Sequence, residues 1–520
     1  MYNLFNKIVH FAARNRRQTM IKKYKKLLSI VLVCAMLFTL SSVVMASAPA
    51  KKNYIIDNPY DDIDWDAWDD YKTQLHCHTN ASDGFLPVQQ FCDMHYALNY
   101  EIVALTDHGT LNRGWNNVPD IVPLMRVIKK ERTNNNTPII PVPEEAYQGY
   151  LNGTNPDRTY TTTAGDLLER TTANGMLDVP LGNEQNMATP FADCHLTSYW
   201  AEYGNGYAGV YGDYETPSRE VAKLGGITFL SHVGEYVYPD KDSADHVGQK
   251  IDEYYVNKFA RIFLDNPGSS LGMGINSATD AHTRCDRILY DQILQKTIPN
   301  GVVPWGNTFA DSHNETSLND AYTMSWMPEL TLDAFRTCLE KGQFFSVSHF
   351  SNGVELNGME EMPGFVEQDV YDTKAYWRDD TPQVKRITVD EENDTITVEG
   401  INANIITWVS NGNVIMRTQL VDGKATLDLH SDELLNDPYL YLRFYLSGDN
   451  GICYANPMVL NVEGETFPEV DVPFTVDLPL FLRALVTVLD VTVFKYNPII
   501  WIFKYFGLGY NPLSQLFKLY

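Results

Sequence analysis

The sequence predicts an α/β protein, in which a barrel-like domain is followed by a small all-β sandwich. Three observations predict it. Apolar, β-rich segments end in histidines or carboxylates, helix-like stretches lie between these segments, and from about residue 383 to 462 the chain changes to short alternating strands separated by turns. At 520 residues the chain also exceeds one ordinary core, since a domain has roughly 100–200 residues.

Polar side chains end nearly all the strand-like segments of the first domain, which span residues 72–78, 102–108, 227–232, 271–277 and 308–313. Helices are predicted at 87–97, at 217–224 with Thr216 as cap, and at 332–341 between Thr331 and Gly342. Because the loops at the strand ends of a barrel converge on one mouth, the polar side chains are expected to gather there.

The second domain is predicted from five short strands at 395–398, 405–410, 414–420, 425–429 and 439–446. Asn411-Gly412 and Asp422-Gly423 are hairpin signals, because both residues of such a turn need positive φ. The predicted division is residues 51–375 for the barrel-like domain, 383–465 for the sandwich and 466–520 for an apolar, aromatic C-terminal segment.

Residues 1–50 have the three-part pattern of a secretory signal peptide: a basic stretch, an apolar run at 27–45 and small residues at 46–50. An uncleaved membrane anchor is the alternative. Cleavage would change the formal charge from −26 to −34, because the leader holds eight Lys or Arg and no acid. We therefore expect a secreted, strongly acidic protein, which excludes nucleic-acid binding through a basic patch.

Residues 466–520 combine aromatic and basic side chains, which suits peripheral contact with a membrane or cell envelope, and packing on the protein's own surface is the alternative. The cysteines outside the leader are scattered without CxxC spacing. Neither a thiolate zinc site nor a disulfide scaffold is indicated.

Six of the 12 histidines lie beside apolar strand-like runs or glycine turns, together with three carboxylates. His76 and His78 are two residues apart on an apparent strand, so both rings project from one face and can reach one metal ion. The complete set of candidate metal ligands is His76, His78, Asp83, His108, Glu184, His195, His232, Asp311 and His313.

In their order along the chain, HCHTNASDG, LTDHG, GNE, SHVG and ADSH resemble the motifs of the polymerase and histidinol phosphatase (PHP) family of metal-dependent phosphoesterases. The resemblance covers roughly residues 70–350. It implies a distorted seven-stranded β/α barrel that holds two or three divalent ions, zinc, manganese or iron, on those nine side chains. Glu184 and Asp311 are the carboxylates suited to bridge two ions.

Several assignments have alternatives. Pro143-Glu144-Glu145 also resembles a family glutamate motif, although His195 follows Glu184 at family-like spacing. Asp280 and His282 form a second DxH and are held as reserve ligands. Asp107 either orients a ligand histidine through its ring N–H or caps a turn. Three arginines could clamp a phosphate or lie on a solvated surface: Arg113, Arg284 and Arg287.

The favoured function is a secreted phosphoesterase that acts on a small phosphorylated molecule through metal-activated water, with Asp107, Glu184 and Asp311 as catalytic candidates. The same chemistry would serve a hydrolase of amide, carbamate or carboxylic esters. A non-catalytic binding module at the cell surface is the alternative outside enzymes.

Overall fold

The computed structural model describes most of the chain after the predicted leader. The described residues are 52–120, 138–185, 195–205, 212–235, 237, 250–275, 284–349, 380–473, 482, 485, 486 and 489. The chain divides into Met1–Asn53 and Tyr54–Tyr520, and nearly all described residues belong to the second unit. The leader, Asp280, His282 and most of 466–520 lie outside them. Within the described part, no helix is long and apolar enough to cross a membrane.

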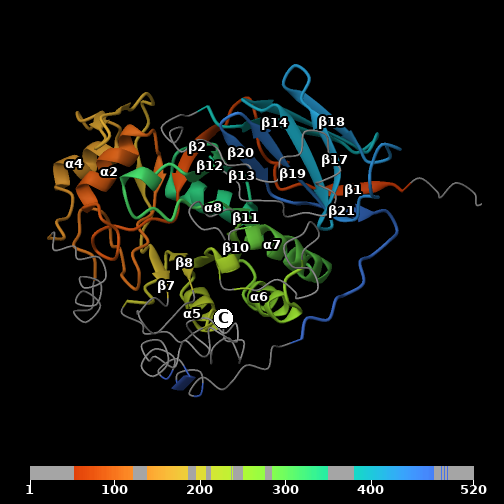
Figure 1. Ribbon diagram of the computed structural model, residues 1–520, viewed down its shortest axis with the longest axis horizontal. Helices are drawn as coiled ribbons and strands as arrows, with labels where there is room; N and C mark the ends of the chain where they lie inside the picture. Colours follow the sequence, from red (N-terminus) through yellow and green to blue (C-terminus); the bar gives the residue numbers. More distant parts are fainter. Residues whose placement is uncertain are drawn as a thin grey trace, which may run out of the picture. The chain divides into compact units, whose positions relative to one another are not determined.

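The largest sheet has 11 strands (Figure 1). In spatial order they are β1 (Tyr54–Asp57), β21 (Met458–Val462), β19 (Leu440–Gly448), β20 (Gly451–Ala455), β13 (Phe344–Ser348), β12 (Ala321–Met327), β2 (Asp69–Gln74), β3 (Ile102–Val103) and β6 (Leu177–Asp178), with β16 (Ile405–Ser410) and β17 (Asn413–Gln419) attached through β19. Strands of the predicted barrel and of the predicted sandwich therefore share one hydrogen-bonded sheet, because β13 pairs with β20.

A second sheet has five strands in the order β11 (Trp305–Asn307), β10 (Ser270–Gly274), β9 (Ile227–Leu230), β8 (Leu196–Tyr199) and β7 (Asn183–Gln185). The pairs β9–β10 and β10–β11 are parallel, whereas β7–β8 and β8–β9 are antiparallel. Two small sheets complete the set: β14 (Gln383–Asp390), β15 (Thr395–Ile401) and β18 (Lys424–Asp428), and β4 (Thr159–Thr161) with β5 (Leu167–Glu169).

The predicted α/β class is confirmed, but the described strands form no single closed sheet. The two large sheets are instead connected by isolated parallel bridges beyond the ends of their strands, between Cys77 and Ser312 and between His108 and Glu184. The regular ladders of the two sheets end before they meet, because the strands near the bridges are short: β3 has two residues and β7 has three. Both bridges lie among the predicted ligands, so the junction of the sheets coincides with the candidate site.

Helices α2 (Val88–Ala97) and α8 (Leu332–Lys341) lie where the sequence predicts them. Thr331 Oγ1 accepts the Ala334 N–H and Gly342 ends α8 with a φ of 72°. Helix α5 (Glu215–Lys223) begins earlier than predicted, and Thr216 is not its cap, because Asp213 accepts the Thr216 N–H. The other helices are α4 (Glu144–Leu151), α6 (Glu253–Asp265), α7 (Arg284–Thr297) and the 3-10 turns η1 (Val233–Glu235), η2 (Ile298–Asn300) and η3 (Glu315–Ser317).

The two predicted hairpin turns have different outcomes. Asn411 and Gly412 adopt φ values of 48° and 75° and join the paired strands β16 and β17, as predicted. Asp422 and Gly423 also have positive φ, and Val421 and Lys424 on either side of them exchange both backbone hydrogen bonds, so the two-residue turn forms as predicted. Beyond this one bridge β17 and β18 do not pair, because they belong to different sheets. The turn instead passes the chain from one sandwich layer to the other.

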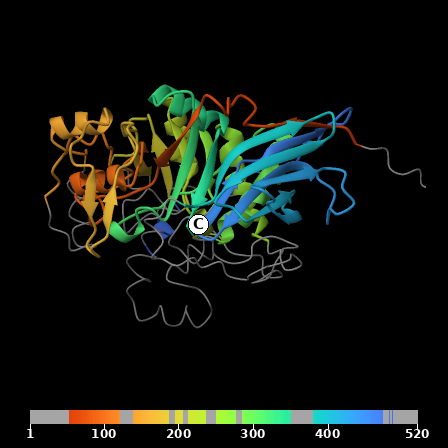
Figure 2. The same ribbon diagram turned by 90° about the horizontal axis from the view of Figure 1, so that it is seen from above.

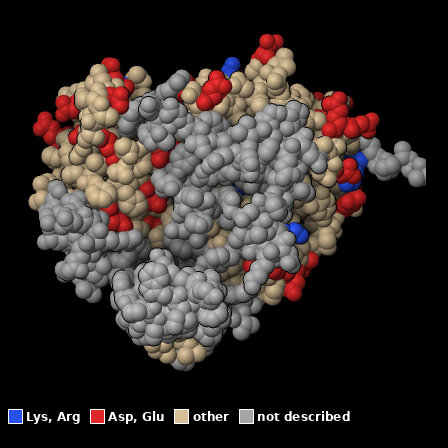
Figure 3. Space-filling view, in the orientation of Figure 1, with Lys and Arg blue, Asp and Glu red and all other residues tan. Residues whose placement is uncertain are grey.

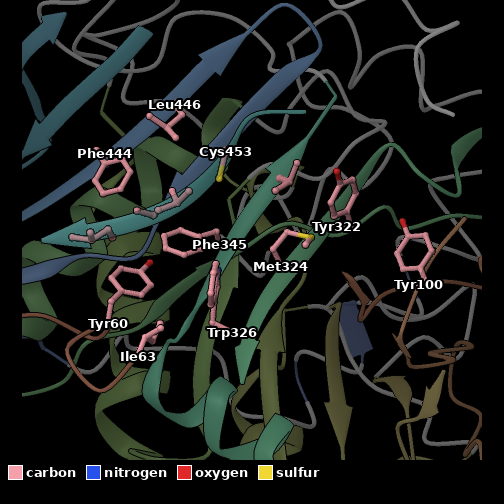
Figure 4. Packing of buried hydrophobic residues seen from close by; sticks show 14 of the residues in the cluster. Tyr60, Ile63, Tyr100, Tyr322, Met324, Trp326, Phe345, Phe444, Leu446 and Cys453 are labelled. Atoms are coloured by element: carbon pink, nitrogen blue, oxygen red, sulfur yellow. The ribbon is translucent and has the colours of Figure 1, made fainter. Parts of the chain in front are cut away.

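The strands of the predicted barrel and those of the sandwich run side by side (Figure 2). One apolar core connects the strands around β12 with the sandwich (Figure 4). Tyr60 stacks on Phe345 with ring centroids 4.6 Å apart, and Trp326, Phe444 and Leu446 lie in the same cluster. The predicted boundary between 375 and 383 falls largely outside the described residues and stays a prediction. What the described strands establish is continuous packing across both parts.

Candidate metal centre

The nine predicted ligands lie in or beside strands and the turns that follow them. His76 and His78 come after β2, and His108 comes after β3. Glu184 lies in β7 and His195 directly before β8, while the remaining ligands follow β9 and β11 or occupy a turn. The structure brings all nine into three overlapping groups, which are His78, Asp83, His108 and His313; His76, His78, Glu184 and Asp311; and Glu184, His195 and His232.

The first group, which we call the Asp83 group, is centred on one carboxylate. Asp83 Oδ1 lies 3.7 Å from His78 Nδ1 and 3.4 Å from His313 Nε2. Asp83 Oδ2 lies 3.3 Å from His108 Nε2. Three imidazoles thus converge on the two oxygens of one side chain.

The second group, the Asp311 group, contains the HxH pair. The Nε2 atoms of His76 and His78 are 3.2 Å apart, and each is 3.2 Å from Glu184 Oε2. Asp311 Oδ1 lies 3.3 Å from His76 Nε2 and 3.0 Å from His78 Nε2. Two imidazoles and two carboxylates therefore surround one point.

The third group, the His232 group, uses the other oxygen of the same glutamate. Glu184 Oε1 is 2.8 Å from His195 Nδ1 and 3.4 Å from His232 Nε2, and these two ring nitrogens are 3.2 Å apart. The two oxygens of Glu184 therefore face different groups. This geometry supports the bridging role that the sequence predicts for Glu184.

The contacts of Glu184 and Asp311 fit metal ligation better than hydrogen bonding. Among the described residues, no donor reaches either oxygen of Glu184, or Oδ1 of Asp311, with hydrogen-bond geometry. Atoms bound to one ion at roughly 2.0–2.1 Å stand about 3.0–3.5 Å from each other, as these atoms do. Buried carboxylates without hydrogen-bond donors are costly, so the donor set fits divalent cations.

The electrostatics of the centre point the same way. Burial alone would raise the pKa of Glu184, but His76 and His108 hold it well below its usual value. For Asp311, too, burial would raise the pKa and His76 lowers it, and the pKa is well below its usual value. Burial lowers the pKa of His76 itself. Burial would lower the pKa of His78 as well, but the hydrogen-bonding carboxylate Asp311 acts in the opposite sense, and the pKa is raised to about 10. Buried carboxylates among imidazoles offer the mixed oxygen and nitrogen donors that suit a hard or borderline cation.

Two of the ligands have unusual backbone conformations. His232 has a φ of 32° and Asp311 a φ of 46°, a region that residues other than glycine rarely adopt. Such conformations persist only where the surrounding structure over-determines them, and they are concentrated at functional sites. His232 lies two residues after β9 and Asp311 four residues after β11, and both side chains lie close to Glu184 or the HxH pair.

Asp107 does not touch a ligand histidine directly. Its Oδ1 accepts hydrogen bonds from Thr79 N at 2.8 Å and Ser82 Oγ at 2.7 Å, and its Oδ2 accepts one from Thr79 Oγ1. Ser82 Oγ in turn lies 3.2 Å from His78 Nδ1. Asp107 therefore caps the turn that carries Thr79 and Ser82, and it is linked to His78 through Ser82.

Close backbone approaches explain two glycines of the motifs. A Cβ at Gly84 would lie 2.3 Å from the carbonyl oxygen of His78, and one at Gly182 would lie 2.2 Å from that of Leu105. Any larger residue would push apart the turns that carry Asp83 and Glu184. Thr79 and Ser82 were not predicted as site residues, although hydroxyls in a turn after HxH are natural partners of a nearby carboxylate.

The centre is open on one side. The side chains of His76, His78 and Glu184 are fully buried, whereas Asp311 is 19% and His313 32% exposed. Among the described ligands, solvent therefore reaches the centre at His313 and Asp311.

The remaining candidates do not join the groups. Glu144 and Glu145 are exposed at the start of α4, and Glu144 is held by Asn116 and Gln148, so the structure favours Glu184. Arg113 pairs with Asp120 and Glu202 at the surface. Arg287 is fully buried in α7 rather than solvated, and the Arg284 side chain lies outside the described atoms.

No family model matches the chain, and no curated protein matches it. Several solved structures are similar to it, among them the following three. A two-domain protein containing a predicted PHP-like metal-dependent phosphoesterase, from Bacteroides vulgatus, shares 13% identity over 78% of this chain and 99% of its own, with a TM-score of 0.33. PsfC from Pseudomonas syringae shares 11% over 52% and 87%, with a TM-score of 0.28. The lesion-specific endonuclease PfuEndoQ from Pyrococcus furiosus shares 9% over 52% and 56%, with a TM-score of 0.27. The site is accordingly interpreted from its own geometry.

Proposed function

We propose that this protein is an exported, metal-dependent phosphoesterase of the PHP type. One observation carries the proposal: nine His, Asp and Glu side chains form three overlapping groups, with the two oxygens of Glu184 facing two of them. Adjacent groups that share a carboxylate are suited to hold ions a few Å apart. Two or three divalent ions, zinc, manganese or iron, match this mixed ligand set.

Each part of the centre then has a role. Glu184 and Asp311 supply negative charge, and the imidazoles fix the geometry without adding any. Divalent ions bound there would lower the pKa of water toward about 7 and stabilise charge that develops on phosphoryl oxygens. The fully buried HxH pair keeps bulk water from the inner side, while His313 and Asp311 border the path of the substrate. Asp107 keeps His78 in place through Ser82.

The substrate we propose is a small phosphorylated molecule. On the face shown in Figure 3, carboxylates are spread over the described surface and Lys and Arg are few, in keeping with a net charge of −26. Such a surface repels a polyanionic backbone, whereas a cluster of cations attracts a single phosphate group locally. A hydrolase of amide, carbamate or carboxylic esters and a non-catalytic binding module are the other outcomes of the test.

We further propose that the protein is secreted. The support is the basic, apolar and small-residue pattern of residues 1–50. Residues 466–520 would give the exported protein a peripheral contact with a membrane or the cell envelope, as their aromatic and basic composition favours.

The test uses residues 51–520, the form expected after export. Aryl phosphate mono- and diesters and aryl carboxylic esters are assayed after chelation, and again after zinc, manganese or iron is added. We expect phosphoester cleavage that metal restores and that His78→Ala abolishes. Cleavage of carboxylic esters alone would favour the amide or ester hydrolase, and no turnover with any metal would contradict an enzymatic function.

A further inference from the structure

The turn that carries His232 is held by a helix that no motif includes. Residues Val233–Glu235 form η1 directly after His232, and Gly234 N donates a hydrogen bond to Asp286 Oδ1 on α7. Asp286 is fully buried. A Cβ at Gly234 would lie 2.6 Å from Asp286 N and 2.7 Å from its Oδ1. The backbone two residues beyond His232 therefore lies directly against the first turn of α7.

The same helix is fixed to the sandwich. Asp291 Oδ1 accepts hydrogen bonds from Tyr441 OH at 2.5 Å and Arg443 Nε at 3.0 Å, and Oδ2 accepts one from the guanidinium. The side chains of Asp291 and Arg443 are each 2% exposed. Gly412 N, in the β16–β17 turn, donates to Tyr441 OH at 2.8 Å. Strand β19 and the β16–β17 turn of the sandwich thus hold α7 at Asp291. Asp291 lies about 7.5 Å from Asp286 along the helix axis, at 1.5 Å per residue.

Apolar packing joins the same parts. One buried cluster contains Leu230 at the end of β9, Val233 in η1, residues of α7 and residues of the sandwich strands. Its members from α7 and the sandwich include Ile288, Leu289, Ile293, Val409, Val414, Tyr441 and Tyr445. Close-packed interiors transmit displacement, because they have few voids to absorb it. Moving α7 would therefore move the turn that orients His232.

The conformation of His232 makes this support necessary. A φ of 32° is strained for a residue with a Cβ, and such strain relaxes unless the neighbouring backbone is fixed. Asp286 fixes it from one side through Gly234, and Val233 is buried with no exposure.

We propose that Asp286 is a positioning residue for His232, and that the sandwich, through its grip on α7, is part of the metal centre's supporting structure. The inference rests on the proposed metal centre, in which His232 is a ligand. It assigns the sandwich a role beyond that of a flanking domain: it sets the affinity of the His232 group.

The experiment is a calorimetric titration of chelator-treated protein with Zn²⁺, which reads binding and not turnover. His232→Ala identifies the binding event that belongs to the His232 group. Asp286→Ala is expected to weaken that event by about 10- to 100-fold, the usual effect of removing a group that orients a ligand, and to leave the other events within about twofold. Asp286→Asn keeps an acceptor oxygen for Gly234 N and should restore the affinity.

Tyr441→Phe removes one hydrogen bond from the sandwich to Asp291. It therefore tests whether the sandwich holds α7 in place, with little risk to folding. It should weaken the same event, by less than Asp286→Ala does. The matched control is Asp178→Ala. Asp178 also accepts a hydrogen bond from a backbone N–H, that of Trp115, whereas the hydrogen bond between α7 and η1 is made by Asp286. Circular dichroism of each variant checks that it is folded.

The outcomes are distinguishable. If the folded Asp286→Ala variant binds zinc as the wild type does, the inference is wrong. It is also wrong if the substitution weakens every zinc-binding event equally. In both cases the proposed metal centre is not contradicted. If Tyr441→Phe affects an event other than the one lost in His232→Ala, the role of the sandwich is wrong. If the wild type binds no zinc, manganese or iron at all, the proposed function fails and the inference fails with it.

Discussion

Two buried polar clusters in this protein are built in opposite ways. In the cluster of Asp291, Tyr441 and Arg443, the carboxylate meets donors with hydrogen-bond geometry and a guanidinium that matches its charge. In the candidate metal centre, Glu184 and Asp311 are surrounded by imidazole nitrogens at 2.8–3.4 Å, yet Glu184 has no hydrogen-bond donor among the described residues.

The difference teaches how to distinguish a structural cluster from a binding centre. The first cluster is complete as it stands, because its charges and hydrogen bonds are satisfied within the protein. The second offers several buried acceptors that one cation could bind at once. Asp320 is an intermediate case: it is buried, its Oδ1 has no described donor, and burial raises its pKa to about 7.

The largest effect is expected for Glu184→Gln. The variant keeps the shape of the side chain but removes the charge that two groups share, so both should bind metal more weakly. Since each ion contributes several kcal/mol to transition-state stabilisation, kcat for an aryl phosphate should fall by roughly 10³-fold or more. A steady-state assay with added metal measures it. A loss below tenfold would show that Glu184 is not a shared ligand.

Arg443→Met should lower the free energy of unfolding by about 3–5 kcal/mol, because Asp291 would be left buried without its partner. Urea denaturation measures this loss. The double variant Asp291→Leu/Arg443→Met should recover most of it, since no charge remains buried. Recovery of the single variant by added zinc to wild-type stability would contradict the view that this cluster is complete without an ion.

The smallest effect is expected for Asp320→Asn, and it depends on pH. Because the folded-state pKa of Asp320 is raised from 3.8 to about 7, its contribution to stability is fully present below pH 3.8 and is lost as the pH rises through 7. The variant should therefore be more stable than the wild type at pH 8, by about 2–4 kcal/mol at roughly 1.4 kcal/mol per pKa unit. At pH 4 the two should agree closely.

Thermal unfolding at both pH values measures this difference. An equal gain at pH 4 and pH 8 would mean that the ionisation of Asp320 is not its cause.

That the nine candidate side chains gather in one place could be predicted from the sequence, because the signals are local. HxH spacing, a glycine turn after Asp83 and a histidine at the end of most strand-like runs are visible without knowledge of the fold. Helix α8 was predicted to the residue for the same reason, since Thr331 and Gly342 determine its ends.

One error is local: the start of α5 is set by Asp213, only three residues before Thr216. The other features that the sequence did not predict depend on residues far apart in the chain. The Asp422-Gly423 turn is correct locally, but the pairing of β18 with β15 sends its strands into different layers. The contacts of α7 with η1 and β19 join residues 52 to 152 positions apart. No periodicity or motif reports such contacts, so the support of His232 could be found only in the structure.

The central claim is that the nine side chains hold metal ions, and the metal content of the protein tests it most directly. Residues 51–520, purified without chelators, are analysed by inductively coupled plasma mass spectrometry beside Glu184→Gln and His78→Ala. We predict two or three divalent ions per wild-type chain and a clear loss in both variants. A metal-free wild type that takes up no zinc, manganese or iron, or an equal content in all three proteins, would contradict the account.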